Sequence, residues 1–418
     1  MAKMLVTAAP RRSDAEEVVM WFTVELLGCE GSLSETRQRC QVRVYTRCRD
    51  RVNPPATRSD SFVTSVSGEP RPALTTRRPT MRDVAELAGV GIKTVSRVVN
   101  GEPNVSAQTA ERVRRAAASL HYEPDMHAGN LRRADGRSRT LGLLVSSVAN
   151  PFAAQVHRAI ERVATEHGYG VLATSLEDDP DAEVRAVAAL ARRRVDGFVV
   201  TPVRVDQTYL RVHVDRGTPI VCVDREPRGL DTDSVVSANT EGAAAAVRHL
   251  ISRGHRRIAF LGDLERIQTA RLRLDGYIQE LTAAGFDVDR SLVVMGLHDE
   301  ASATAVARRL LTLPDPPTAV FSSQNLVTIG TVRALQQLGR ENVVALVGFD
   351  DIETSDLLKP GITTVAQDPD RIGRLAAERL FARIDGELGP PRHLVVPTRL
   401  VVRGSGEIPG PGAATTRA

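Results

Sequence analysis

The feature that most limits the fold of this chain is an alternation of short apolar runs with amphipathic segments, which begins at Thr140. Runs rich in Val, Ile and Leu include LGLLVSS, PIVCVD, RRIAFLG and VVALVGFD. Apolar strands separated by amphipathic helices of about 10 to 15 residues predict parallel sheets with helices on both faces. Because the series begins a second time near Arg256, we expect two similar α/β lobes.

Residues 80–122 show a different pattern, which predicts three short helices. MRDVAELAG ends at Gly89, a residue suited to a left-handed helix terminus, and IKTVSRVVN follows after a tight turn. The third segment, SAQTAERVRRAAASLHY, begins at Ser106, a residue type favoured at helix starts. The residues expected to face inward recur at helical spacing and are Val84, Leu87, Ala88, Val95, Val98, Val99, Val113, Ala116, Ala117 and Leu120. These are the parts of a helix-turn-helix.

The excess positive charge is concentrated around these three helices. The chain of 418 residues has a formal net charge of +4, but residues 77–139 contain 12 basic and 7 acidic residues, a net +5. Residues 140–418 contain 32 basic and 35 acidic residues, a net −3. A short basic segment of this kind is suited to binding a polyanion such as DNA.

Motifs and composition exclude several other classes of protein. No apolar run reaches the roughly 18 to 20 residues of a membrane span, and Val18–Gly28 lacks the cleavage site of a secretory signal. The four cysteines form neither a CxxC pair nor a zinc spacing, which fits a reducing cytoplasm. We find no GxSxG, GxGxxG, P-loop or HExxH, so we expect no enzyme, no cofactor and no metal.

The string TMRDVAELAGVGIKTVSRVVNG, followed by VSAQTAERVRRAAASLHYEP, resembles the headpiece of the LacI/GalR family, and the resemblance extends over residues 80–407. It implies a multidomain α and α/β fold, in which a helix-turn-helix headpiece and a hinge helix precede a two-lobed sensor like that of periplasmic sugar-binding proteins. The second helix of such a headpiece lies in the major groove of DNA. By position, we expect base contacts from Ile92, Lys93 and Arg97.

Further residues match family positions that contact the DNA backbone or the minor groove. The expected phosphate contacts are Thr80, Thr94, Ser96, Asn100, Ser106, Thr109 and Tyr122. For Ser106 and Thr109, a role as helix caps alone is an alternative. EPDMHAGNLRR resembles the family's hinge helix and places Leu131 as a wedge in the minor groove. Two hinge helices meeting in one groove imply a homodimer on pseudo-palindromic double-stranded DNA, associated with the nucleoid.

In the predicted sensor, residues that follow strands match the family's effector positions: Asn150, Phe152, Asp224, Arg225, Arg273, His298, Gln324, Asp350 and Gln367. Carboxylates, guanidiniums and amides beside an aromatic ring suit the hydroxyls and the apolar face of a sugar. Asp224 with Arg225 could instead be a surface pair, and His298 a solvated side chain. The resemblance implies a repressor of carbohydrate-related genes. A sugar-binding protein without a DNA role is the alternative, and inducer or corepressor action both stay open.

These patterns predict six parts of the chain. They are residues 1–76, without regular structure; 77–122, the helix-turn-helix; 123–139, the hinge; 140–236 with 369–394, a first lobe; 237–366 with 395–407, a second lobe; and 408–418, a disordered tail. For residues 1–76 two hypotheses remain, a flexible arm or a start codon assigned too early, with the native protein beginning near Met81.

Overall fold

The computed structural model describes residues 21–26, 42–47, 79–99, 102–123 and 136–412. β1 (Trp21–Leu26) and β2 (Val42–Arg47) form an antiparallel ribbon in a unit separate from residues 78–418. We expected little regular structure here. The two segments, WFTVEL and VRVYTR, are rich in the β-branched and aromatic residues that favour strands, which accounts for the difference.

The headpiece consists of α1 (Met81–Ala88), α2 (Ile92–Val99) and α3 (Ala107–Ser119). Gly89 ends α1 in the left-handed conformation (φ 62°), and its amide donates to the carbonyls of Ala85 and Glu86. The buried core is small and comprises Val84, Ala85, Ala88, Val95, Val113 and Ala116. The prediction that Leu87 faces inward is wrong, because its side chain is 56% exposed. Ala85 takes the inner position instead, one residue after Val84 on the stripe that faces α3.

The first sensor lobe, which we call the N-lobe, is built on a six-stranded parallel sheet in the order β13-β7-β6-β5-β3-β4. Its strands are β3 (Thr140–Val145), β4 (Gly170–Ser175), β5 (Gly197–Val200), β6 (Ile220–Val223), β7 (Asp233–Ser237) and β13 (His393–Val396). Its helices are α5 (Pro151–Glu166), α6 (Pro180–Arg192), α7 (Arg211–Val214) and α12 (Pro369–Ile384), with a 3-10 turn η1 (Thr208–Leu210).

The second lobe, the C-lobe, has a sheet in the order β14-β12-β11-β10-β8-β9, in which only β14 is antiparallel to its neighbour. Its strands are β8 (Ile258–Leu261), β9 (Val293–Val294), β10 (Ala319–Ser322), β11 (Ala345–Phe349), β12 (Thr363–Ala366) and β14 (Arg399–Val401). Its helices are α8 (Asn239–Ser252), α9 (Gln268–Ala283), α10 (Glu300–Leu311) and α11 (Asn325–Leu338), with 3-10 turns η2 (Arg290–Leu292) and η3 (Gly404–Gly406).

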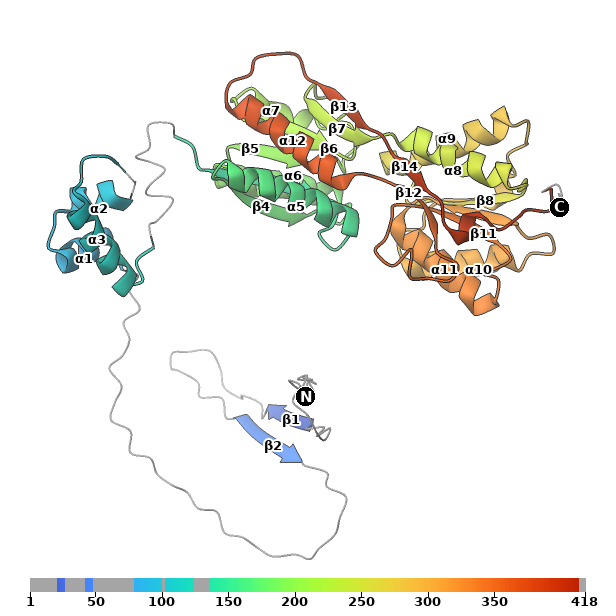
Figure 1. Cartoon of the computed structure of the whole chain (residues 1–418), viewed down its shortest axis with the longest axis horizontal. Coiled ribbons are helices and arrows are strands. Elements are labelled where there is room, and N and C mark those ends of the chain that lie inside the picture. Colours follow the sequence, from blue (N-terminus) through green and yellow to red (C-terminus); the bar gives the residue numbers. More distant parts are fainter. Residues whose placement is uncertain (1–20, 27–41, 48–78, 100–101, 124–135, 413–418) are drawn as a thin grey trace, which may run out of the picture. The chain divides into compact units, whose positions relative to one another are not determined.

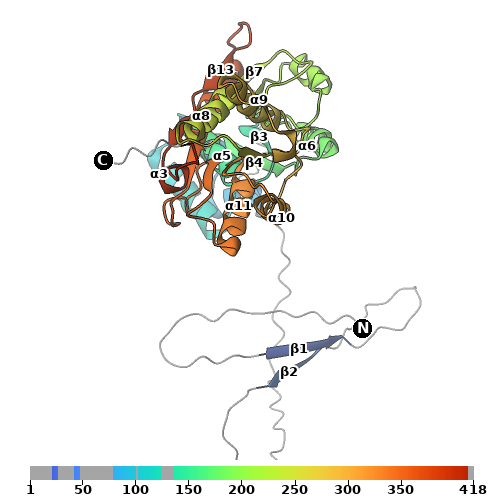
Figure 2. The ribbon, with the colours of Figure 1, turned by 90° about the vertical axis from the view of Figure 1, so that its right-hand side faces the viewer.

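Each sheet carries helices on both faces, as expected for apolar parallel strands. In the N-lobe, α5 and α12 pack on one face through Ile160 and Leu380, and α6 packs on the other through Leu190. In the C-lobe, α8 and α9 cover one face, and α10 and α11 cover the other (Figure 2). The predicted two-lobed α/β architecture is therefore confirmed.

The chain passes between the two lobes three times, after β7, after β12 and after β13. Figure 1 shows the result, because α12 and β13, coloured red, lie among the green elements of the N-lobe. The third passage lies at Pro397 and Thr398, since β13 pairs with β7 up to Val396, two residues beyond the expected boundary.

Residues 408–412, which we expected to belong to a disordered tail, are held in place by hydrogen bonds. Gly410 donates its amide to the Arg253 carbonyl (2.8 Å), and the Ile408 carbonyl lies 2.9 Å from Nε2 of the buried His255. These contacts hold residues 408–412 against the turn that follows α8. Within the described residues, no helix is long and apolar enough to cross a membrane.

Candidate nucleic-acid interface and effector site

Helix α1 begins with a reciprocal cap between Thr80 and Asp83. The Thr80 amide donates to Asp83 Oδ2 (2.7 Å), and the Asp83 amide donates to Thr80 Oγ1 (3.4 Å). The Thr80 hydroxyl also donates to Asp83 Oδ2 (2.7 Å). Each cap bond satisfies an amide that the first helical turn leaves without a partner. Thr80 therefore fixes the start of α1, and its expected phosphate contact stays a prediction.

Helix α2 has one face in the core and one face in solvent. Val95 is fully buried against α1 and α3, whereas Ile92 is 43% exposed and Lys93 and Arg97 are exposed. Lys93 and Arg97 lie two residues before and after Val95, on the opposite side of the helix, so burying Val95 directs both away from the core. Ile92 is exposed at the first position of α2. The second helix thus presents one apolar and two cationic side chains to a partner.

The guanidinium of Arg97 has one acidic neighbour, Glu102, at 3.9 Å. Both side chains are about half exposed, so this ion pair contributes little to stability. A ligand with a stronger acceptor can displace Glu102 at small cost.

The remaining predicted DNA residues fall into three groups: a helix cap, half-buried side chains, and residues outside the described part of the chain. Ser106 caps α3, because its hydroxyl accepts from the Thr109 amide (3.3 Å) and donates to Thr109 Oγ1 (2.9 Å). Thr94, Ser96 and Tyr122 are half-buried, and Tyr122 packs against the headpiece core. Asn100 and Leu131 lie outside the described residues.

In the sensor, one aspartate follows an equivalent strand in each lobe. Asp224 comes directly after β6 and Asp350 directly after β11, and both adopt the left-handed conformation (φ 67° and 72°). Asp is one of the few residue types that tolerates this region, and such backbone strain concentrates at functional sites. The Asp224 amide donates to the Val235 carbonyl and the Asp350 amide to the Val365 carbonyl, both at 3.0 Å. The sheets therefore hold both carboxylates at their carboxyl edges, where ligands bind in folds of this type.

Arg273 of α9 is a buried cation that interacts electrostatically with both carboxylates. Its Nε donates to Asn239 Oδ1 (2.8 Å) and its Nη1 to the Ser323 carbonyl (2.6 Å). Its guanidinium carbon lies 3.7 Å from the centre of the Phe349 ring, a cation–π contact. Four elements of the C-lobe thus hold one side chain in place.

Burial perturbs the charges at this centre. Burial raises the pKa of Asp224, although Arg225 and Arg273 oppose the effect. Burial lowers the pKa of Arg273, and Asp350, Asp224 and Asp263 oppose it. Charges withdrawn from water in this way interact strongly with any polar group that enters the site.

A chain of polar contacts joins the two lobes. In the N-lobe, Arg225 Nη1 donates to Asp178 Oδ1 (2.8 Å), and the two side chains are only 8% and 7% exposed. The alternative that Arg225 belongs to a surface pair is therefore wrong. In the C-lobe, His298 Nδ1 lies 2.8 Å from Asp263 Oδ1, while His298 Nε2 is 3.9 Å from Asp178 Oδ2 across the cleft. The hydrogen bond with Asp263 raises the pKa of His298.

Gln324 and Asn325, at the start of α11, extend this set. Gln324 Nε2 donates to Asp263 Oδ2 (3.3 Å), and its Oε1 accepts from the Leu326 amide as the cap of α11. Asn325 Nδ2 donates across the cleft to Asn150 Oδ1 (3.1 Å). The amide of Asn150 thus joins the lobes as well as capping α5.

Phe152 and Gln367 complete the predicted effector residues. Phe152 is half-buried in the first turn of α5, and its amide donates to Asn150 Oδ1 (3.0 Å). Gln367 Nε2 donates to Asp350 Oδ1 (2.5 Å), and Gln367 Oε1 accepts from the Ser237 hydroxyl. Hydrogen bonds thus connect several of the predicted residues where the two lobes meet, whereas Phe152 packs against the core of the N-lobe.

Two parts of the chain match described families. Residues 80–125 match "Bacterial regulatory proteins, lacI family", and residues 247–406 match "Periplasmic binding protein-like domain". The HTH-type transcriptional regulator PtxS of Pseudomonas aeruginosa is 34% identical over 337 residues, covering 78% of this chain and 96% of PtxS. The ribose operon repressor of Escherichia coli is 33% identical over 330 residues, covering 78% and 99%. This chain belongs to the lacI family.

Solved structures agree with this assignment. The lac repressor dimer bound to operator and the anti-inducer ONPF aligns with a TM-score of 0.69 at 28% identity, covering 79% of this chain and 99% of that one. The complex of the regulator CelR with cellobiose aligns with a TM-score of 0.59 at 35% identity, covering 78% and 100%. This lacI-family chain is a DNA-binding transcriptional regulator and not an enzyme. The predicted family and function are confirmed, and a sugar-binding protein without a DNA role is not supported.

Sequence reasoning missed three polar residues of the cleft in this lacI-family sensor, Asp178, Asp263 and Asn239. Asp178 lies in a polar loop where an aspartate is ordinary on sequence grounds, but it is 5% exposed and pairs with Arg225. Asp263 lies two residues after β8, in the same kind of position as Asp224 after β6, and that signal could have identified it. Within the described residues, no group of three or more His, Cys, Asp or Glu side chains is arranged to hold a metal ion.

Proposed function

We propose that this lacI-family regulator is a repressor of carbohydrate-related genes, which binds a pseudo-palindromic operator as a homodimer and responds to a sugar or sugar derivative. The observation that carries the DNA-binding half is the amphipathic α2, which buries Val95 and presents Ile92, Lys93 and Arg97 outward. Lys and Arg suit the O6 and N7 acceptors of guanine in the major groove, and Ile92 suits a thymine methyl group.

The phosphate contacts proposed around α2 are Thr80, Thr94, Ser96, Asn100, Ser106, Thr109 and Tyr122, and Leu131 is the proposed minor-groove wedge. Such contacts fix the register of the protein on DNA without reading sequence. Thr80 and Ser106 cap the amino ends of α1 and α3, so their hydroxyls lie at helix amino ends. Helix amino ends favour a bound phosphate.

The effector half of the proposal rests on the cleft between the lobes. Asp224, Asp350 and Arg273 are held by their own lobes and supply acceptors and donors for neighbouring hydroxyls. The relatives named for ribose and cellobiose support a sugar as the ligand class. A ligand that replaces the Asn150–Asn325 bond with its own hydroxyls would change the free energy of lobe closure.

We propose that residues 123–139 are the hinge that carries this change to the DNA-binding unit. The Asp196 carboxylate accepts from the amides of Ser138 (2.7 Å) and Arg139 (2.8 Å), and Arg137 Nη1 donates to Asp385 Oδ1 (3.0 Å). Hydrogen bonds from Arg137, Ser138 and Arg139 therefore fix the carboxyl end of the hinge segment to the N-lobe. Allosteric coupling of this type is typically worth about 1 to 3 kcal/mol, or roughly 5- to 150-fold in DNA affinity.

Selection of bound sequences from random duplexes tests the proposal directly. We expect an enriched pseudo-palindrome, with an affinity that falls steeply as salt rises. Gel-shift titration of that operator with a panel of sugars should then change the operator affinity in one direction. A sugar that lowers the affinity is an inducer, and one that raises it is a corepressor.

If no sequence is enriched over random duplex, the proposed DNA binding is wrong. If no sugar changes the operator affinity, that result counts against the proposed effector. Residence in the cytoplasm on the nucleoid follows from the same proposal.

A further inference from the structure

Five arginines line the mouth of the cleft, and only one of them, Arg225, belongs to the predicted effector residues. A cavity of about 80 Å³ lies between the lobes there, and a single carboxylate, that of Glu226, belongs to its lining. The arginines that line it are Arg204, Arg225 and Arg228 from the N-lobe with Arg266 and Arg271 from the C-lobe. We call these five residues the arginine rim.

Three guanidiniums of the arginine rim have no carboxylate partner among the described residues. Arg266 Nη2 donates only to the Asp178 carbonyl (3.2 Å), and Arg271 Nη1 donates only to the Glu265 carbonyl (2.6 Å). The Arg228 side chain has no hydrogen bond or ion pair within that part of the chain. Like charges that approach from opposite lobes repel one another, so this arrangement favours a bound anion.

The N-lobe half of the rim is built on two buried polar side chains. Gln207 is 0% exposed, and its Nε2 donates to the Arg204 carbonyl (2.7 Å) while its Oε1 accepts from the Arg228 amide (2.9 Å). Glu183, also 0% exposed, accepts from the Arg204 amide (2.7 Å) and from the Tyr209 hydroxyl (2.7 Å). Arg204 and Arg228 are therefore placed side by side by a rigid support.

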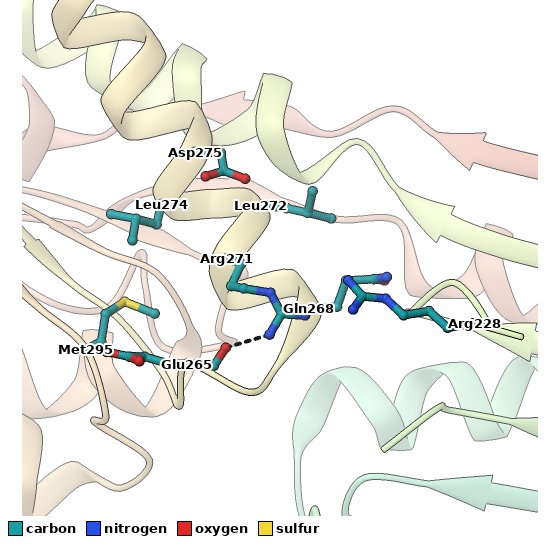
Figure 3. A pocket seen from close by; sticks show the side chains of 8 residues that line it. All are labelled: Arg228, Glu265, Gln268, Arg271, Leu272, Leu274, Asp275 and Met295. Atoms are coloured by element: carbon teal, nitrogen blue, oxygen red, sulfur yellow. Dashed lines mark hydrogen bonds between the residues drawn. The ribbon is translucent and has the colours of Figure 1, made fainter. Parts of the chain in front are cut away.

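The C-lobe half of the rim contacts the N-lobe half through the first turn of α9. Gln268 Oε1 accepts from the Glu226 amide across the cleft (2.8 Å). Figure 3 shows Arg228 extending toward Gln268 and Arg271 at the start of α9. These three residues also line a larger cavity of about 450 Å³, whose other lining residues are Leu272, Leu274 and Met295 with the acidic Glu265 and Asp275. The rim therefore opens into a space with both apolar and acidic walls.

One buried donor points to a missing partner at the same place. Arg225 is 6% exposed, yet its Nε has no hydrogen bond, and the nearest carboxylate oxygen, on Asp224, is 3.6 Å away. Buried donors in native proteins are normally satisfied, by protein, water or ligand. Arg225 lies both in the predicted effector set and in the arginine rim, so a ligand can span the two.

We propose that the arginine rim binds a phosphate group, which bridges Arg228 of the N-lobe and Arg271 of the C-lobe. Guanidiniums match phosphate oxygens with paired N–H donors, and such charge-assisted bonds are among the strongest in proteins. The phosphate removes the repulsion between the two halves and so favours lobe closure. This inference rests on the proposed function, because it assigns a phosphate to the effector or to a co-ligand that acts with it.

Calorimetric titration of the full chain with inorganic phosphate, in chloride buffer of fixed ionic strength, tests the site. We expect phosphate to bind, and Arg228→Gln and Arg271→Gln each to weaken its binding by about tenfold or more. Arg192→Gln, an exposed arginine of α6 outside the rim, is the matched control and should bind as wild type. Unchanged thermal unfolding shows that the variants are folded.

A second set of titrations identifies the source of the phosphate. Aldose 6-phosphates that bind more tightly than both inorganic phosphate and the free aldoses make the group part of the effector. Free aldose that binds more tightly in the presence of inorganic phosphate makes phosphate a separate co-ligand. Both results support the site.

Two results would overturn the inference: phosphate that binds no better than chloride, or rim variants that bind it as tightly as wild type. Operator binding is measured on the same preparations. If the protein binds its operator but not phosphate, only the phosphate inference is wrong. If it binds phosphate but prefers no duplex sequence, the proposed function is wrong.

Discussion

The headpiece and the sensor cleft handle their charged residues in opposite ways. On α2, Lys93 and Arg97 lie in solvent, and the one acidic neighbour of Arg97 is half exposed at 3.9 Å. In the cleft, Arg273 is buried, hydrogen-bonded twice and stacked on Phe349. The headpiece keeps its cations hydrated and available for a polyanion, whereas the centre of the cleft binds its buried cation, Arg273, to side chains and carbonyls of the protein itself.

This contrast indicates what each partner must do on binding. DNA gains affinity by adding contacts and releasing counterions, because little protein structure has to be broken. An effector has to replace bonds that exist between the lobes, such as the one between Asn150 and Asn325. Changes in the cleft should therefore alter stability, while changes on α2 should alter DNA affinity alone.

The largest effect expected is that of Arg273→Met. Removing this buried cation takes away a charge that opposes the burial of Asp224 and leaves Asn239 Oδ1 and the Ser323 carbonyl without their donor, and the loss of a buried charge partner costs about 3 to 5 kcal/mol. Calorimetry should show a lower Tm for the sensor and loss of effector binding. Arg248→Gln is the control, since Arg248 pairs with Glu280 but is 64% exposed and should matter by less than about 1 kcal/mol. An unchanged Tm for Arg273→Met would break the comparison.

Arg97→Ala should reduce operator affinity by about 1 to 3 kcal/mol and relax the preference at one base pair. The Tm should stay the same, because the side chain is exposed. Glu102→Gln is the matched variant, which removes the neighbour of Arg97 and should leave operator affinity equal or slightly higher. Competition gel shifts measure both. Equal losses on operator and random duplex would instead make Arg97 a phosphate contact.

Thr80→Ala should destabilise the headpiece by about 1 kcal/mol through loss of the α1 cap. Thr80→Asp separates the two roles assigned to this position, because Asp caps helices well but repels phosphate. Thermal unfolding should distinguish Thr80→Ala from wild type and find Thr80→Asp close to wild type. DNA binding should fall most for Thr80→Asp, and an Asp variant with full affinity would remove Thr80 from the phosphate set.

The smallest effect concerns pH. The hydrogen bond to Asp263 raises the pKa of His298 above its ordinary value of 6.5, so the folded sensor binds this proton more tightly than the unfolded chain. Its stabilisation is fully present below pH 6.5 and is lost as pH rises through the raised value. Denaturant unfolding gives the free energy of unfolding of the wild type and of His298→Gln at each pH. The difference between the two should decline from acid to alkaline pH. A difference that is constant with pH would contradict it.

The headpiece was predictable in type because local patterns decide it. The helical spacing of apolar residues within each of the three segments, which buries Val84, Val95 and Val113, is visible in the sequence, and so is the terminator Gly89. Leu87 was assigned wrongly because hydrophobicity alone favours burying Leu over Ala. In an eight-residue helix the inner stripe is narrow, and the small side chain of Ala85 occupies it.

The cleft was predictable only in part. Asp224 and Asp350 were found because they match family positions and directly follow strands. Arg273 was found by its family position alone, because it lies within α9 and not at the strand end where we expected it. The pairing of Asp178 with Arg225 depends on which loops meet, and an aspartate in a polar loop is ordinary on sequence grounds. The arginine rim contains residues of both lobes. No sequence pattern predicts that residues 204 and 271, which lie in different lobes, line the same cavity.

The three passages between the lobes have a consequence for how the protein is made. α12 supplies Ile372 and Leu380 to the N-lobe core, and β13 supplies its edge strand, yet both follow every core strand of the C-lobe in the sequence. During translation the N-lobe is begun first but completed after the C-lobe sheet has largely left the ribosome. A nascent chain halted just after β12 would therefore hold an N-lobe in which only α5 covers the face that α5 and α12 share, and the exposed apolar remainder would be a target for chaperones and proteases.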